Sequence, residues 1–407
     1  MRICMISGSF PTMRCGIADQ VWHLSHHLCR LGHEVSVVTS RNESTAAGAA
    51  SATGEPRLEV RPLIESWRRP GPVVAAVSAS DCDIVHLEYQ TALYERHPMI
   101  NGLPATLEVA GLRQPVVTRF HDLWGPKLFP GAGRLGLRSR YVAQLAARSE
   151  AALVSNDRHR RQLATLLGGK TEHLTNVPLG PGVPPSVTEE QAACQRQELG
   201  VREGELLGVY FGLVQSGTGK GLAALLKAIA ETREIGTRWV CLGGGQSARD
   251  GRHQERLRRL AGSLGIADRV TWLGYVPDRQ VSAVLSAADV CVLPYEDGAE
   301  FHRSSLVTVL SHRVPLVTTY VGCLPSPLRS GEHVLAVPAG DPAELGRAMS
   351  RLATDSGLRE HLRANLAQLE DSFAWPSLAR RTAAVYADVR QRVGSGGLGA
   401  RREGAKA

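Results

Sequence analysis

The residues with the clearest chemical potential lie between Val209 and Leu226. An apolar segment, VYFGLV, is followed by the small-residue loop QSGTGKG and then by LAALLKAIAE, which has the composition of a helix. A loop of this kind places backbone N–H groups and the ammonium group of Lys220 at a helix N-terminus, where an anion is stabilised. The segment therefore predicts a binding site for a phosphorylated ligand.

This loop differs from the P-loop of ATPases. A P-loop has a glycine five residues before its Gly-Lys pair and a serine or threonine after the lysine. This chain has Val214 and Gly221 at those two positions, so no dedicated magnesium ligand follows the lysine. A nucleotide-sugar site fits the segment better than a nucleoside-triphosphatase site.

The elements that must position the loop alternate between apolar strands and amphipathic helices. The first half predicts strands at 2–7, 34–40, 82–89, 115–122 and 151–156, with helices at 17–31 and 137–150. The second half predicts strands at 206–214, 238–245, 269–275, 290–295 and 314–320, with helices at 222–231 and 254–265. This order is typical of parallel sheets covered by helices.

The chain is long enough for two such sheets, because it has 407 residues, of which 43% are hydrophobic. Residues 176–190 are rich in proline and glycine and predict a linker. We therefore expect an α/β fold of two doubly wound, Rossmann-like domains that face each other across a cleft. The expected divisions are 1–180, 181–372, a C-terminal helix at 373–392 and a disordered polar tail at 393–407.

Charge and cysteine content limit the classes of partner and of site. Lysine and arginine number 47 against 39 acidic residues, which suits anionic small molecules, an anionic membrane surface or nucleic acid. Nucleic acid is not expected, because no basic block with interleaved aromatic residues is present. The eight cysteines show no metal-ligand spacing, so no metal site is expected and the thiols are predicted to be reduced.

Hydropathy predicts a soluble, cytoplasmic protein. No run approaches the roughly 20 apolar residues of a membrane helix, and the N-terminus enters a strand rather than a signal peptide. Peripheral association with the inner face of a membrane stays open, because the chain is basic.

The order of seven segments resembles the family 4 retaining glycosyltransferases of the GT-B fold: FPTMRCGIADQ, FHDLWGP, FGLVQSGTGKGL, LGGG, LGYV, ADVCVLPY and VPLVTT. Residues 373–389 resemble the helix that in this family crosses back to the first domain. The resemblance implies metal-independent transfer of a hexose-type sugar from a nucleoside diphosphate to an acceptor hydroxyl, with retention of anomeric configuration. It leaves the acceptor open between a carbohydrate, an aglycone and a lipid-linked molecule, which residues 90–98 and 124–130 are expected to meet.

In the first domain, the resemblance assigns two residues to the donor sugar. The backbone at Gly16 approaches the sugar and phosphate, which the missing Cβ permits. The imidazole of His121 lies close to the transferred sugar, where it can donate to a hydroxyl. The structural alternatives are a plain loop glycine and, for His121 with Asp122, a structural hydrogen bond or helix cap.

In the second domain, the resemblance gives Lys220 the role of neutralising the β-phosphate as the nucleoside diphosphate departs. Asp297 and Glu300 compete for the role of the acid near the sugar hydroxyls; a solvated loop with an N-cap serine is the structural alternative. The remaining donor-binding residues implied are Gly212, Gly219, Gly244, Tyr275, Val276, Arg303, Ser304, Ser305 and Thr308.

Two positions depart from the family pattern. The arginine that usually follows the glycine of the FxG strand is replaced by Leu213, and Arg303 or His302 could supply the second charge instead. The family's two glutamates, separated by seven residues, correspond to Glu300 and Thr308, so the second acid is missing. Ribose binding must then be weaker, differently placed or performed by another group.

Two alternatives to glycosyl transfer remain. A sugar-nucleotide epimerase or a phosphorylase uses the same fold. A catalytically degenerate partner subunit that only binds a nucleotide sugar would tolerate the changes at Leu213 and Thr308.

Overall fold

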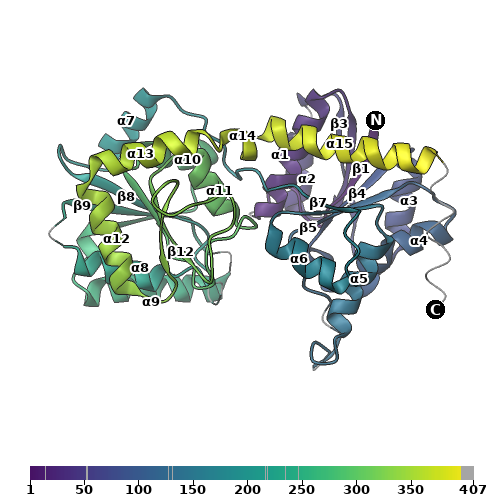
Figure 1. The fold of residues 1–407 in the computed structure, drawn as a ribbon. Coiled ribbons are helices and arrows are strands. Elements are labelled where there is room, and N and C mark those ends of the chain that lie inside the picture. The colour runs from purple at the N-terminus through teal and green to yellow at the C-terminus, as the bar shows by residue number, and fades with distance from the viewer. Residues whose placement is uncertain are drawn as a thin grey trace. The chain divides into compact units, whose positions relative to one another are not determined.

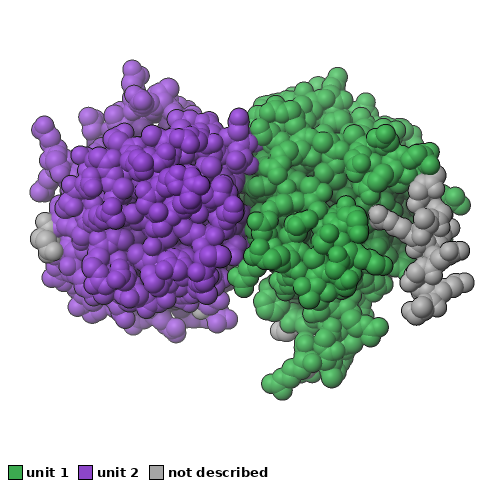
Figure 2. Space-filling model, viewed as in Figure 1, with its two compact units in different colours: residues 1–179, 375–407 green, residues 180–374 purple. Residues whose placement is uncertain are grey.

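The computed structural model describes residues 1–13, 15–51, 54–126, 128–130, 132–215, 217, 219–233, 235–245 and 247–395. The chain forms two compact units (Figure 2). Unit 1 contains residues 1–179 and the segment from Trp375 onward, and unit 2 contains residues 180–374. The division at 179/180 falls inside the segment rich in proline and glycine.

Unit 1 is built on a seven-stranded parallel sheet in the order β3-β2-β1-β4-β5-β6-β7. Its central strands are apolar and buried along their length, as expected where helices cover both faces. The strands are β1 (Arg2–Ile6), β2 (Glu34–Ser40), β3 (Leu58–Ile64), β4 (Ile84–Tyr89), β5 (Val116–Phe120), β6 (Ala151–Val154) and β7 (Leu174–Asn176).

The helices of unit 1 include the C-terminal one, which packs beside the first (Figure 1). The ring of His23 in the first helix stacks on Trp375 at a centroid distance of 5.1 Å. The helices are α1 (Gly16–Arg30), α2 (Glu43–Ser51), α3 (Gly71–Ser80), α4 (Leu103–Val109), α5 (Leu137–Arg148), α6 (Asp157–Leu166) and α15 (Trp375–Gly394), with 3₁₀ turns η2 (Thr91–Tyr94) and η3 (Pro98–Gly102).

Unit 2 repeats this architecture around a six-stranded parallel sheet in the order β10-β9-β8-β11-β12-β13. Its strands are β8 (Leu206–Phe211), β9 (Thr237–Leu242), β10 (Val270–Gly274), β11 (Val290–Leu293), β12 (Leu316–Tyr320) and β13 (Leu335–Pro338). Its helices are α7 (Glu189–Glu198), α8 (Leu222–Glu231), α9 (Ala248–Ser263), α10 (Asp278–Ala287), α11 (Ser304–Ser311), α12 (Pro342–Thr354), α13 (Ser356–Ala367) and α14 (Glu370–Phe373), with the 3₁₀ turn η4 (Ala267–Arg269).

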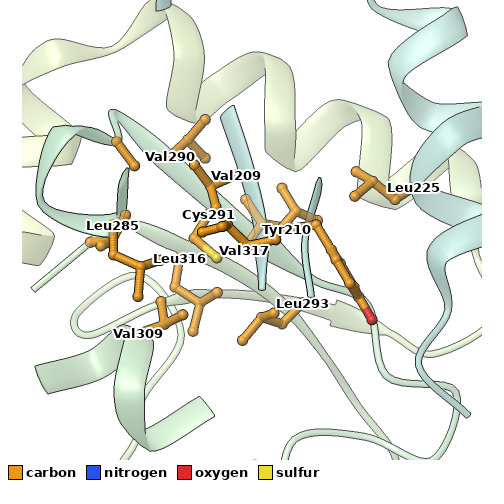
Figure 3. Packing of buried hydrophobic residues seen from close by; sticks show 14 of the residues in the cluster. Val209, Tyr210, Leu225, Leu285, Val290, Cys291, Leu293, Val309, Leu316 and Val317 are labelled. Carbon is orange, nitrogen blue, oxygen red and sulfur yellow. The ribbon is translucent and has the colours of Figure 1, made fainter. Parts of the chain in front are cut away.

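The core of unit 2 centres on β8, β11 and β12. Val209, Cys291 and Val317 are fully buried there and pack beside Tyr210 and the helical residue Leu225 (Figure 3). Each large apolar side chain removed from water in this way contributes about 1.5–3 kcal/mol. This packing holds the carboxyl ends of β8 and β11 next to each other.

The predicted fold class, two parallel α/β domains, is confirmed. The strands predicted around the glycines end early: β8 ends at Phe211 and β9 at Leu242, because Gly212 and Gly243 adopt positive φ angles and leave the sheet. Strands β3, β7 and β13 were not predicted, and α9 begins at Ala248 rather than at 254. Helix α15 reaches Gly394, and residues 396–407 of the expected tail lie outside the described residues.

Candidate functional site

The largest group of predicted site residues lies in unit 2, at the carboxyl ends of β8 and β11. These strands are neighbours, but the chain leaves them in different directions, since β9 lies on one side of the pair and β12 on the other. Such a switch point is the usual ligand site of doubly wound sheets. The N–H of Glu296, after β11, donates to the carbonyl oxygen of Gly219, after β8, at 2.8 Å. The two loops therefore form one surface.

Two glycines allow the backbones at this edge to come close. A Cβ at Gly221, which caps α8 with a φ of +66°, would lie 1.7 Å from the carbonyl oxygen of Pro294. A Cβ at Gly243, with a φ of +111°, would lie 2.1 Å from the carbonyl oxygen of Gly212. Any other residue would force the loops apart at both places.

Two cationic side chains, one from each loop, lie over one aromatic ring. The ammonium nitrogen of Lys220 lies 5.5 Å from the centroid of the Tyr295 ring, and the guanidinium carbon of Arg303 lies 4.3 Å from it. Tyr295 is buried, and its hydroxyl is 2.8 Å from the hydroxyl of Ser305. The buried ring thus fixes two cations at cation–π distance on the edge of the sheet.

The charge at this edge is only partly balanced. Arg303 is 8% exposed and pairs with the carboxylate of Asp297, while its buried Nε has no hydrogen-bond partner among the described residues. Burial, together with the nearby charge of Arg303, lowers the pKa of Lys220 to about 8, and Asp297 opposes this only in part. Within the described part of the chain, Lys220 forms no ion pair. The arrangement favours an incoming anion.

Asp297 and Glu300, which compete for one role, differ in their surroundings. Asp297 is engaged with Arg303, whereas the main-chain carbonyl of Glu300 accepts the N–H of Arg303 at 3.0 Å. The Glu300 residue is half-buried. Asp297 and Glu300 therefore both stay candidates for contact with sugar hydroxyls, Asp297 through a carboxylate that also pairs with Arg303.

The other predicted residues of unit 2 line the same edge. Gly212 follows β8, and its N–H donates to the carbonyl oxygen of Leu242 at the end of β9 at 3.0 Å. Gly244 follows β9, Tyr275 and Val276 follow β10, and Ser304 begins α11. Tyr275 is 49% exposed, so it is accessible to a ligand.

Thr308 is buried, and its hydroxyl is already hydrogen-bonded within unit 2. The sequence places it among the donor-binding residues, but it is 1% exposed and its hydroxyl oxygen accepts the N–H groups of Gly182 at 3.1 Å and Val183 at 3.5 Å. Both acceptor positions of the hydroxyl are engaged by these two bonds, so Thr308 anchors the start of unit 2 against α11.

The two predicted residues of unit 1 lie at the carboxyl edge of its sheet. Gly16 is the first residue of α1, which follows β1, and His121 directly follows β5. The Asp122 carboxylate accepts the N–H of Trp124 at 3.1 Å, which turns the chain away from the sheet, and burial raises the pKa of this carboxyl group. The His121 Nε2 lies 2.5 Å from the carboxylate of Glu88 on β4.

Sequence reasoning missed Glu88. It is fully buried: burial alone would raise its pKa, but the charge of His86 and the hydrogen bonds and charge of His121 outweigh this and hold the pKa well below the ordinary value, which favours the ionised carboxylate. The signal was present as the polar residues of IVHLEY, since a charged residue in a buried strand needs partners.

The described residues lack two kinds of feature. None of their helices combines the length and apolar character needed to cross a membrane. They also contain no group of three or more histidine, cysteine, aspartate or glutamate side chains arranged to hold a metal ion.

Two family models match the chain. Residues 15–180 match the glycosyl transferase 4-like domain, and residues 207–355 match the glycosyl transferases group 1. Similar curated proteins are D-inositol 3-phosphate glycosyltransferases, among them those of Streptomyces bingchenggensis (29% identity, 48% of this chain and 44% of that one) and Acidothermus cellulolyticus (29%, 56% and 51%). The chain thus spans about half the length of the curated relatives it matches.

Solved structures match over nearly the full length. A glycosyltransferase of Rickettsia africae has a TM-score of 0.74 at 12% identity and covers 95% of this chain and 98% of its own. HepE of Anabaena in complex with UDP has a TM-score of 0.74 at 16% identity, with 95% and 100% covered. At these identities the likeness concerns the fold. With both family models matching in the expected order, the chain belongs to the family 4 glycosyltransferases of the GT-B fold.

Proposed function

We propose that the protein transfers a sugar from a nucleoside diphosphate to an acceptor hydroxyl, with retention of anomeric configuration. The observation that supports this most strongly is the pair of cations, Lys220 and Arg303, fixed on the ring of Tyr295 at the switch point of unit 2. A diphosphate is the ligand whose charge such a pair matches.

The proposed role of the two cations is to stabilise the leaving group. As the bond to the sugar breaks, negative charge grows on the β-phosphate, so a fixed cation acts more strongly in the transition state than in the ground state. Arg303 stands in for the arginine that Leu213 replaces, and its buried, unpartnered Nε would donate to a phosphate oxygen. The N-terminus of α8 adds its dipole.

Asp297 or Glu300 is proposed to contact the sugar hydroxyls, and His121 and the backbone at Gly16 are proposed to approach the sugar and phosphate. Gly244, Tyr275, Val276, Ser304 and Ser305 are proposed to hold the nucleoside. Retention is proposed to proceed on one face of the sugar, with the departing phosphate oxygen accepting the proton of the acceptor hydroxyl.

Because Lys220 and Arg303 are permanent parts of the site, a metal is not needed to neutralise the diphosphate. Treatment with EDTA should leave turnover unchanged, and restoration of lost activity by Mg²⁺ would contradict this.

The acceptor is proposed to meet the exposed aromatic segment after β5. Trp124 and Phe129 are 64% and 50% exposed, and the guanidinium of Arg138 lies 5.4 Å from the Trp124 ring. Aromatic faces with adjacent arginines suit sugars and anionic head groups. Phosphorylated cyclitols are the first acceptors to test, since the similar curated proteins are named for one. Binding to anionic lipid vesicles would test peripheral membrane association.

The central experiment combines binding with product analysis. Calorimetry with UDP, GDP and ADP identifies the nucleotide, and UDP-glucose is the first donor to test because a similar structure, HepE, is described in complex with it. NMR of the product then reports the anomeric configuration. Lys227→Ala is the matched control for Lys220→Ala, because Lys227 is an exposed lysine of α8.

The results separate the alternatives. An acceptor-dependent product with retained configuration supports the proposal, and an inverted product refutes the retaining mechanism. A new sugar nucleotide formed without acceptor indicates an epimerase, and release of a sugar phosphate in the presence of phosphate indicates a phosphorylase. Binding without turnover of any donor favours the partner-subunit alternative, and no binding of any nucleotide removes the catalytic proposal altogether.

A further inference from the structure

A chain of buried polar groups crosses the core of unit 1 and ends at His121. The hydroxyl of Tyr386, on α15, lies 2.7 Å from Nδ1 of His86. Nε2 of His86 lies 2.9 Å from one carboxylate oxygen of Glu88, and Nε2 of His121 lies 2.5 Å from the other. Tyr386, His86 and Glu88 are fully buried, and His121 is 6% exposed. Four side chains, from β4, from the residue after β5 and from α15, thus form one continuous chain of hydrogen bonds.

Strand geometry explains how these residues meet. His86 and Glu88 are two residues apart on β4, so both side chains point to the same face of the sheet. Glu88 pairs in register with Arg119 of β5, and His121 follows two residues later on the same face. The Nε of Arg119 lies 3.8 Å from the Glu88 carboxylate, and its Nη2 donates to the hydroxyl of Thr382 on α15 at 3.2 Å. The sheet and α15 therefore enclose the carboxylate.

Burial of these polar and charged groups costs free energy. Leu87 and Phe120, which precede Glu88 and His121 in sequence, are apolar and buried. Apolar side chains in place of the buried polar ones would stabilise the core at least as well. A buried carboxylate with two histidine donors instead fixes the hydrogen positions of both rings. An ionised carboxylate only accepts, so each histidine must present N–H at Nε2.

The hydrogen bonds then determine the state of each ring. In His86, whose pKa is lowered by burial, Nδ1 is left without a proton and accepts from the Tyr386 hydroxyl. In His121, the bond to Glu88 is the ring's single hydrogen bond within the described residues, which leaves Nδ1 for a ligand. This changes the expectation that a neutral His121 donates to a sugar hydroxyl: with its proton on Nε2, Nδ1 accepts.

We propose that Glu88 is a positioning residue, which together with His86 and Tyr386 holds His121 in one orientation with its proton on Nε2, so that Nδ1 accepts a hydrogen bond from a hydroxyl of the bound sugar. The proposal rests on the proposed function for the sugar contact, whereas the proton position is a property of the free protein. Glu88 acts on the reaction only through His121, which distinguishes it from a residue that merely stabilises the core.

The test is a double-mutant cycle on kcat with Glu88→Met and His121→Asn. Methionine has a similar volume but leaves Arg119 and both histidines without the carboxylate, so folding of the variant is checked first by thermal unfolding. Each single variant should lower kcat on the order of 10–100-fold, the usual effect of a supporting partner, and the double variant should be no slower than the His121→Asn single variant. Multiplying losses would overturn the proposal. Glu88→Gln, which is isosteric, serves as the second variant if Glu88→Met fails to fold.

Two further measurements separate the outcomes. In NMR spectra of protein with ¹⁵N-labelled histidine, the Nε2 proton of His121 should give a downfield signal that is protected from exchange. Glu88→Met should abolish this signal. Absence of the signal in the wild-type protein refutes the proposal, even if no donor is ever found. Thr118→Val is the matched control, since this buried β5 hydroxyl bonds to Ser149 outside the chain of groups. Its kcat should equal that of the wild type. If the NMR signal behaves as expected but no sugar is transferred, the proposed function fails while the positioning role stands.

Discussion

Lys220 and Arg303 are 83 positions apart in sequence, yet both lie over the ring of Tyr295, at 5.5 Å and 4.3 Å from its centroid. Their repulsion is tolerated because the ring attracts both cations and Asp297 pairs with Arg303. A dianionic ligand would relieve the remaining repulsion. The relationship therefore links the loop after β8 with the loop after β11 in a single anion site.

Replacement of Lys220 by alanine should remove turnover and weaken donor binding. Loss of one preorganised donor to a developing charge costs about 3 kcal/mol, which corresponds to a decrease in kcat of about 100-fold or more. Steady-state kinetics and calorimetry with the nucleoside diphosphate measure the two effects. Wild-type rates in Lys220→Ala, with Lys227→Ala as control, would show that the donor assignment is wrong.

Arg303→Ala should reduce kcat as much as Lys220→Ala does, because Arg303 supplies the charge that Leu213 lacks. Arg303→Lys should recover only part of the activity, since an ammonium group lacks the planar fork of donors. The matched control is Arg313→Ala, which removes an exposed arginine paired with Glu370. If Arg303→Ala and Arg313→Ala were equally active, Arg303 would be a structural loop residue.

Donor affinity should depend on pH through Lys220. The pKa of this lysine is lowered to about 8, so the ammonium form, which binds the diphosphate, is lost as the pH rises through that value. The Kd should be constant at low pH and increase up to about tenfold per unit at pH values above the pKa, with proton uptake on binding. Calorimetry in two buffers of different ionisation enthalpy measures the uptake. In Lys220→Arg, which stays charged, the dependence should disappear, and a persistent slope would point to another group.

Thr308→Val should affect stability rather than ligand binding. The variant leaves the N–H groups of Gly182 and Val183 without their acceptor, at a cost of about 1–3 kcal/mol. Thermal unfolding should show a lower midpoint, while the Kd for UDP and the rate of turnover stay within twofold of wild type. A weaker affinity for UDP with unchanged stability would instead indicate that Thr308 contacts the ribose.

The sequence correctly predicts the helices and strands whose apolar residues recur at a single, uninterrupted period. The strand EVSVVTS and the helix LAALLKAIAE were predicted with the boundaries seen in β2 and α8, because each has apolar residues at one clear period. Strand β3, LEVRPLI, was missed because it lies at the sheet edge, where exposed and half-buried residues interrupt the apolar run. The arginine and proline in this strand interrupt the alternation of apolar and polar residues that identifies a strand.

The candidate site also contains residues that a local sequence pattern identifies and residues whose role depends on contacts made only in the fold. Lys220 was recognisable because glycines and a following helix surround it in sequence. The role of Tyr295 as a shared platform for Lys220 and Arg303 depends on the adjacency of β8 and β11, which only the folded sheet establishes. The engagement of Thr308 with Gly182 has the same origin, since no local pattern brings α11 to that segment.

Helix α15 has a practical consequence for dissecting the molecule. It contributes Tyr386 and Thr382 to the polar interior of unit 1 and covers α1 with an apolar face that includes Trp375 and Leu378. A fragment ending at residue 179 would expose that face and leave His86 and Arg119 unmatched, so it should aggregate on expression. Independent production of this half calls for grafting 375–394 onto residue 179 through a short flexible tether.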